Sequence, residues 1–192
     1  MNLLRPVRID LSKVDRPRVV QPELLYHFPI PPDLHGLNPR LLLGRRWWNK
    51  TRKKAYKSNG GFCQACGGSG RLDAHEQYEF DFGKKIARFQ NVVPLCRNCH
   101  MYIHWLSCPV HQKKLILQIG NRVLLSAELP VPEEKMIASG DTYDRIQVTL
   151  EHTLGYSQYR AFWASGWKLD LKVLRLNRLK YRKHKDRGRL IL

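Results

Sequence analysis

The stretch "PLCRNCHMYIH", from Pro94 to His104, decides the fold. It holds two cysteines three positions apart, a histidine directly after the second cysteine, and another histidine four residues later. All four side chains are good ligands for a soft or borderline metal ion. The first question is whether they hold one ion, or two ions with different roles.

The cysteines of this stretch have a matching pair upstream. "CQAC" supplies Cys63 and Cys66, and "CRNC" supplies Cys96 and Cys99, with 29 residues between the pairs. Each short-spaced pair can deliver two thiolates about 2.3 Å from one tetrahedral ion. The "CGGSG" that follows Cys66 offers glycines for a tight turn. The sequence therefore predicts a structural zinc site with four cysteine ligands.

The fifth cysteine, Cys108, is expected to be a small buried apolar residue rather than a ligand. The start, "MNLLRPVRID", lacks the features of a secretory signal, so the cysteines favour metal binding over disulfides. No apolar run approaches the roughly 20 residues that a bilayer requires. We expect a cytoplasmic protein with no membrane partner.

The histidines point to a second ion. On a helix that starts near Cys99, His100 and His104 lie one turn apart on the same face. Cys99 and His100 are adjacent, so on that helix they point about 100° apart. One ion cannot easily take both residues. The cysteine site would anchor the start of the helix, and the two imidazoles would face another site.

The chain is strongly basic. It has 34 Lys and Arg against 16 Asp and Glu, which gives a net charge of +18. A positive field of this size attracts polyanions, so nucleic acid is the expected main partner. The charge gathers in a predicted helix over 45–56 and in a tail over 172–189. The residues expected to contact phosphates are Arg45, Arg46, Lys50, Arg52, Lys53 and Lys54 in the helix, and Arg178, Lys180, Arg182 and Lys183 in the tail.

Between and beside the cysteine pairs lie further residues with a recognisable pattern. "RLDAHEQYEF" places His75 next to Glu76, and "RFQNVVPLC" places Asn91 ahead of the second pair. Together with the four cysteines, His100 and His104, these residues resemble an HNH endonuclease of the zinc-stabilised type, in the ββα-metal (His-Me finger) group. The resemblance covers about a quarter to a third of the chain.

The resemblance implies a site in which two strands and one helix hold a divalent ion, and a base activates water for attack on phosphorus. It implies catalytic roles for His75, Glu76, Asn91 and His100, with Asn91 orienting the base. His100 and His104 would bind the catalytic ion, which could be Mg²⁺, Mn²⁺, Ni²⁺ or Zn²⁺.

The role of His75 has two interpretations. If Ala74 sets the register, His75 is a ligand with His100 and His104, Glu76 stands at the base position, and zinc, nickel or manganese is preferred to magnesium. If His75 is the base, the third ligand comes from Asp73, Glu76, Asp81 or water, and carboxylates favour magnesium. A glutamate base, with an ordinary pKa of about 4.3 against about 6.5 for histidine, would need burial. On that ground we favour the base role for His75.

The predicted fold class is α+β, with a small ββα-metal core built on the cysteine pairs. An extended proline-rich arm over 1–40 holds seven of the eleven prolines. The nuclease core spans 41–110, and a helical basic extension spans 111–192. That extension should contain a helix from about Gln112, with Leu115, Ile119, Val123 and possibly Leu124 on its apolar stripe, and another over 141–154.

The sequence thus favours a metal-dependent DNA endonuclease or nickase, with DNA a more expected target than RNA. Two alternatives stay open. One is a non-catalytic zinc-knuckle module that binds nucleic acid through its basic surface. The other is an assembly factor of a larger nucleoprotein complex, such as a phage or defence complex, in which the nuclease core is degenerate.

Overall fold

The computed structural model describes residues 18–28, 30–140, 165–171 and 190–191. Its elements, in chain order, are the 3-10 helices η2 (Pro22–Tyr26) and η3 (Pro32–Leu34), α1 (Pro39–Ser58), β1 (Leu72–Asp81), β2 (Ile86–Cys96), α2 (Arg97–Ile103), the 3-10 helix η4 (Trp105–Ser107), α3 (Val110–Ser126), α4 (Glu133–Ser139), β3 (Lys168–Asp170) and β4 (Leu190–Ile191). The expected mixture of helices and strands in an α+β fold is confirmed. None of the helices in the described segments has the length and apolar character needed to cross a bilayer.

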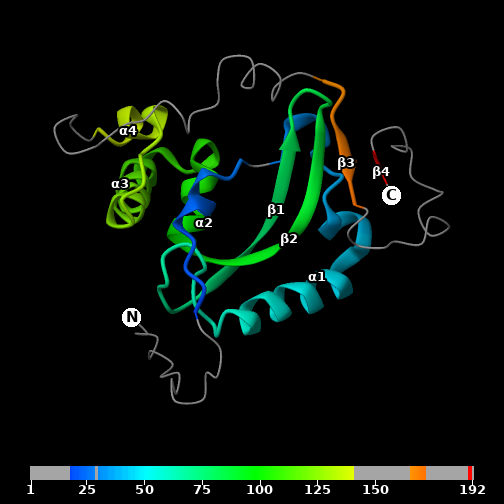
Figure 1. Cartoon of the computed structure of the whole chain (residues 1–192), viewed down its shortest axis with the longest axis horizontal. Helices are drawn as coiled ribbons and strands as arrows, with labels where there is room; N and C mark the ends of the chain where they lie inside the picture. Colours follow the sequence, from blue (N-terminus) through cyan, green and yellow to red (C-terminus); the bar gives the residue numbers. More distant parts are fainter. Residues whose placement is uncertain (1–17, 29, 141–164, 172–189, 192) are drawn as a thin grey trace.

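A long antiparallel hairpin of β1 and β2 forms the centre of the molecule (Figure 1). Short β3 pairs in parallel with β2, and β4 pairs in parallel with β3, so the sheet order is β1-β2-β3-β4. Helix α1 runs along one side of the hairpin, while α2, α3 and α4 gather on the other (Figure 1). Because α2 follows β2 directly, the chain forms a strand–strand–helix unit.

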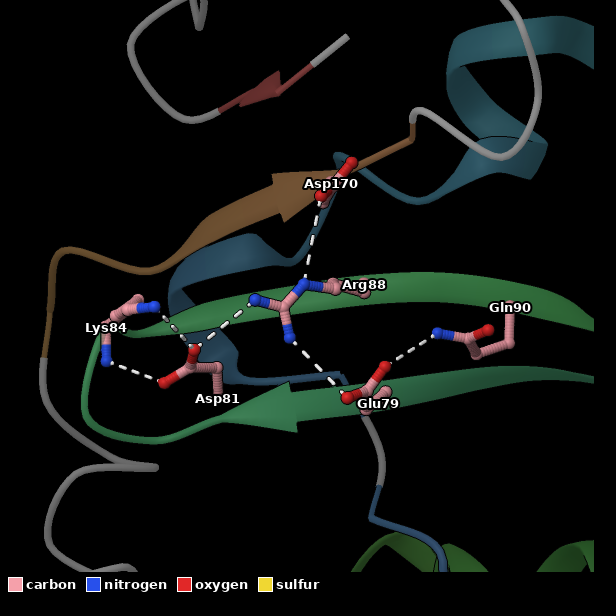
Figure 2. A network of polar contacts seen from close by, with 6 residues as sticks. All are labelled: Glu79, Asp81, Lys84, Arg88, Gln90 and Asp170. Carbon is pink, nitrogen blue, oxygen red and sulfur yellow. Dashed lines mark hydrogen bonds and ion pairs between the residues drawn. The ribbon is translucent and has the colours of Figure 1, made fainter.

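A polar network fixes the far end of the hairpin (Figure 2). The Arg88 guanidinium lies 3.3 Å from Asp81 and 3.6 Å from Glu79, both on β1, and 4.0 Å from Asp170 on β3. The backbone N–H of Lys84 donates to the Asp81 carboxylate at 2.9 Å and closes the turn. Arg88 therefore ties three strands together at the end of the hairpin that is remote from α2.

The hairpin has apolar side chains on both faces because neighbouring strand residues point in opposite directions. Val93 belongs to a first core with α2, α3, α4 and η2, whereas Val92 belongs to a second core with α1 and Trp167. A bulge leaves Gln90 without a strand partner. The extra residue shifts the alternation, so Phe89 joins Val92 in the second core.

The described part of the expected arm is not extended. Pro22 and Pro32 each begin a 3-10 turn, a position that suits proline because its missing N–H is not needed there. Leu25 of the first turn and Leu34 of the second are completely buried, one in each core. Residues 18–40 therefore contribute to the folded core instead of wrapping its surface.

The three helices expected within the described residues, over 45–56, near Cys99 and from about residue 112, are all present. Helix α1 contains the predicted 45–56 segment but begins earlier, at Pro39, where the Asn38 side chain accepts a hydrogen bond from Leu41 N–H. It bends at Gly44, whose φ of 78° lies in the left-handed region. Helix α3 confirms the predicted helix from about residue 112.

The buried face of α3 differs from the predicted stripe. Leu115 is 61% exposed, while Ile116, Leu117 and Leu124 are buried. The reason is Gly120, against which the Tyr102 ring of α2 packs so closely that an added Cβ would overlap it. This close approach sets the rotation of α3, and the apolar pattern alone could not reveal it.

Three predicted features lie outside the described residues. They are the first 17 residues of the arm, the helix over 141–154 and the basic tail over 172–189, which includes Arg178, Lys180, Arg182 and Lys183.

Candidate metal centres

The four paired cysteines form one compact cluster. The sulfur atoms of Cys63, Cys66, Cys96 and Cys99 all lie within 4.8 Å of one another, and those of Cys66 and Cys96 are 3.8 Å apart. Two thiolates on a tetrahedral zinc, each at about 2.3 Å from the ion, are about 3.8 Å apart. The geometry fits one ion, and the predicted cluster that could hold a structural zinc is confirmed.

A local backbone conformation positions each cysteine pair. In the first, Gly67 has a φ of 71°, and hydrogen bonds link Gly67 N–H to Cys63 O (2.9 Å) and Cys63 N–H to Gly68 O (2.8 Å). In the second, Cys96 is the N-cap of α2, whose first N–H groups have no partner within the helix. Hydrogen bonds from the other cysteines, with Cys66 foremost, lower the pKa of the Cys63 thiol well below its ordinary value.

The cluster belongs to the first core. Cys63 and Cys99 are 0% and 1% exposed and pack with Leu95 and Tyr102. Cys108 is buried in the same core but is not part of the cluster, as predicted. Loss of an ion from this site would therefore disturb the packing of the first core around Cys63 and Cys99.

Three histidines form a second cluster. His75 comes from β1, His100 from α2, and His104 from the residue that ends α2. One ring nitrogen from each lies within 4.8 Å of the others. His75 is buried, whereas His100 and His104 are partly exposed. The described part of the chain thus has two clusters that could hold metal, with Cys99 turned into the first core and His100 turned to the second cluster.

Burial keeps these imidazoles neutral. Desolvation lowers the pKa of His75 and His100, and it lowers that of His104 to about 4, with a further contribution from the charges of His100 and Lys135. The neutral imidazole is the form that binds a metal ion.

Asp73 is a neighbour of this cluster and not one of its members. It lies two residues before His75 on the same face of β1, and its Oδ2 is 3.3 Å from His100 Nδ1 and 3.6 Å from the Arg97 guanidinium. A carboxylate on Nδ1 fixes the tautomer and leaves Nε2 of His100 available for a metal. Asp81, another carboxylate weighed as a ligand, lies six residues beyond His75 on β1, about 20 Å from it, in the Arg88 network. It cannot be a ligand.

A ring nitrogen of His75 lies within 4.8 Å of those of His100 and His104, which is compatible with the ligand role; the base role that we favoured from sequence stays a prediction. Glu76, its neighbour, points to the opposite face of β1. There its carboxylate accepts hydrogen bonds from the Tyr78 hydroxyl (2.6 Å) and from Arg40 N–H in the first turn of α1. Burial raises the pKa of Glu76. The carboxylate expected at the base position therefore stabilises the start of α1.

Asn91 lies on β2 opposite Gln77, and its side chain is exposed. It lines a cavity of about 540 Å³ between α1 and β2, together with Trp47, Lys54 and Phe89. This position does not connect Asn91 to the three histidines, so its orienting role stays a prediction.

The basic residues of α1 form an exposed surface. The helix carries no Asp or Glu to offset them. Arg52 is half-buried and donates to Asn49. The sheet separates α1 from the three histidines, because α1 packs in the second core. The exposed residues among those expected to contact phosphates are Arg45, Arg46, Lys50, Lys53 and Lys54.

Two residues near the histidines were missed by the sequence analysis. His27 Nδ1 lies 3.4 Å from His75 Nε2, and burial lowers the pKa of His27 to about 4. The Lys135 ammonium is buried, donates to Leu25 O at 3.1 Å and lies 4.0 Å from the Tyr102 ring. Burial lowers its pKa to about 7. Neither residue stands at a spacing that would have marked it in the sequence.

No protein-family model matches the chain, and comparisons with curated proteins and with solved structures find no match either. Conclusions about function therefore depend on the chain's own residues and their arrangement.

Proposed function

We propose that this protein is a metal-dependent DNA endonuclease or nickase of the HNH type, in the ββα-metal group. The observation that carries the proposal is the convergence of His75, His100 and His104. They come from the first strand of a hairpin and from the helix that follows it, and their nitrogens are close enough for one ion. Three imidazoles favour zinc, nickel or manganese over magnesium.

The residues of the chain supply a rigid and accessible ligand set. Strand pairing with Val93 holds His75, and Asp73 orients His100. The partial exposure of His100 and His104 leaves a side from which a phosphodiester can approach. A divalent ion bound there would supply positive charge to neutralise the phosphate and stabilise the leaving oxygen.

The basic face of α1 would bind DNA away from the scissile phosphate. Because the sheet separates it from the histidines, its lysines and arginines would hold phosphates that flank the cleavage point. Such contacts position the duplex and carry no sequence information. The proposed target is therefore DNA held by its backbone.

One observation favours a non-catalytic alternative, a nucleic-acid-binding or assembly module. Glu76 occupies the base position of the resemblance, yet its carboxylate is engaged by Tyr78 and by the start of α1. A chain that has lost its base could keep the same fold as a zinc-stabilised binding module.

The test is nicking of supercoiled plasmid by the purified protein with Mg²⁺, Mn²⁺, Ni²⁺ or Zn²⁺ and with a chelator control. We expect metal-dependent open-circle product, and at least a 100-fold loss, about the size of one lost electrostatic contact, in His75→Ala. His111→Ala, at an exposed position of α3, is the control and should cleave normally.

Cleavage that persists in a folded His75→Ala protein would remove the three-histidine site from the mechanism. If the wild-type protein binds DNA in a salt-sensitive manner but cleaves with no ion, the binding or assembly alternative is favoured.

A further inference from the structure

The cavity between α1 and β2 has about 540 Å³ of space, a size within the range of sites that take small ligands. It is open to solvent, because three of its lining residues, Lys54, Gln90 and Asn91, are exposed. None of the three clustered histidines lines it. The cavity is therefore a candidate site separate from the histidine cluster.

One wall of the cavity is aromatic. Trp47 of α1 and Phe89 of β2 meet at an interplanar angle of 61°, with ring centroids 6.3 Å apart. Phe89 is buried in the second core, whereas Trp47 packs against that core and stays partly exposed. A partly exposed indole offers a π surface on which another planar ring can stack.

The rest of the lining is polar, and no Asp or Glu is among the described residues that form it. Lys54 lines the cavity, and the exposed Lys50 and Lys53 stand close to it on the same helix. The Gln90 amide donates to Glu79 at 3.0 Å. The exposed Asn91 amide offers both a donor and an acceptor, the combination that reads the edge of a base.

A planar stacking surface, an amide and a group of lysines together match the parts of a nucleotide. We propose that the cavity binds an unpaired nucleotide of DNA, with its base on Trp47, the edge of the base on Asn91 and its phosphate on Lys54. In a duplex both faces of a base are stacked and its pairing edge is occupied, so only an unpaired or flipped nucleotide can enter. The inference rests on the proposed binding of DNA, but it requires neither the histidine metal site nor cleavage.

The experiment measures fluorescence anisotropy of labelled DNA with the full-length protein, its cysteine site filled with zinc and no other divalent ion added. One probe is a short oligothymidylate, and the other is an abasic deoxyribose-phosphate chain of equal length and charge. The wild type should bind the oligothymidylate about 5- to 150-fold more tightly, the contribution of one stacked base. A duplex with one bulged thymidine should likewise bind more tightly than the same duplex with an abasic bulge.

Variants assign this difference to the cavity. Trp47→Leu keeps an apolar side chain against the second core and should lose the preference for the oligothymidylate, while Trp47→Phe keeps an aromatic ring and should restore it. Asn91→Ala should weaken oligothymidylate binding by about 2- to 12-fold, the contribution of one hydrogen bond. Trp105→Leu, at a partly exposed tryptophan beside the first core, is the matched control and should keep the preference. Zinc content and circular dichroism establish that each variant is folded.

The outcomes distinguish this inference from the proposed endonuclease. If the wild type binds both single-stranded probes equally, or binds neither, the nucleotide site is overturned, whatever the plasmid assay shows. A folded Trp47→Leu protein that keeps the preference overturns it as well. If Trp47→Leu does not fold, loss of oligothymidylate affinity in Asn91→Ala supports the site and unchanged affinity overturns it. If the preference depends on Trp47 and the protein cleaves DNA with no ion, the nucleotide site stands and the endonuclease proposal falls.

Discussion

The four-cysteine cluster and the three-histidine cluster share helix α2 but are built differently. Each cysteine pair spans a single short turn, and the cluster lies partly within the first core. The histidines come from the middle of a strand and from the end of a helix, and two of them are partly exposed. The cysteine cluster is therefore placed to stabilise the fold, whereas the histidine cluster depends on the fold to bring its side chains together.

The largest expected effect is a loss of folding stability when a ligand is removed from the cysteine cluster, which a change in the histidine cluster should not cause. Cys99→Ser should lose the structural ion, whose binding in comparable small sites contributes about 10 kcal/mol or more to folding. We expect no cooperative thermal transition and no bound zinc. Cys108→Ala, which removes a buried thiol outside the cluster, should cost only about 1–3 kcal/mol.

By contrast, the His75→Ala protein should keep zinc at the cysteine cluster and should unfold in a cooperative thermal transition. Calorimetry and metal analysis of the variants check both statements. A Cys99→Ser protein that melts as the wild type does would show that the cysteine cluster does not stabilise the fold.

The next prediction concerns Asp73, whose carboxylate lies 3.3 Å from His100 of the histidine cluster. Asp73→Asn should weaken metal binding at that cluster by about 10- to 100-fold, because the carboxylate no longer fixes the His100 tautomer. Binding at the cysteines should not change. Asp81→Asn, at the other end of the same strand, is the matched control. Equal metal affinity in the two variants would refute the orienting role.

The free energy of unfolding should depend on pH through Lys135, which is buried beside Tyr102 of the first core. The pKa of Lys135, lowered to about 7, is below the unfolded value of about 10.4. Between these values the unfolded chain binds one proton more than the folded chain, so stability should rise with pH by about 1.4 kcal/mol per unit. Below pH 7 the Lys135 ammonium is protonated in both the folded and the unfolded state, so the cost of burying its charge no longer changes with pH.

Lys135→Met removes this titration. Between pH 7 and pH 9 the free energy of unfolding of the wild type should therefore rise relative to that of the variant. Denaturant titrations at the two pH values measure it. Parallel pH profiles for the two proteins would mean that Lys135 does not titrate in this window.

The smallest expected effect is on DNA affinity through α1. Lys50→Gln with Lys53→Gln removes two exposed charges and should reduce the salt dependence of DNA binding by about 1.8 in the logarithmic slope. Metal content should not change. The double change Lys114→Gln with Arg122→Gln, on the exposed face of α3, is the charge-matched control. An equal effect of both pairs would show that α1 is not a preferred DNA-binding surface.

Much of the two clusters could be predicted from the sequence because their geometry is local. Two cysteines three positions apart share one turn, and helical periodicity alone separates Cys99 from His100. The same periodicity predicted α1 and α3. The burial of Cys108 followed from the residue type.

Other features depended on contacts between distant segments. Strand pairing and the packing of α2 brought His75 to His100 and turned Glu76 toward α1. Gly120 set the buried face of α3 through Tyr102, and the buried leucines drew residues 18–40 into the cores. These outcomes depend on which surfaces meet, and sequence spacing does not encode that directly.

Residue type and local periodicity were enough to indicate two groups of side chains that could hold metal ions, a basic surface and an α+β fold. The packing of separate elements brings His75 within 4.8 Å of the helix histidines, Asp73 within 3.3 Å of His100 and His27 within 3.4 Å of His75. Each of these contacts joins residues from separate elements, and the packing of those elements on the hairpin sets the distances.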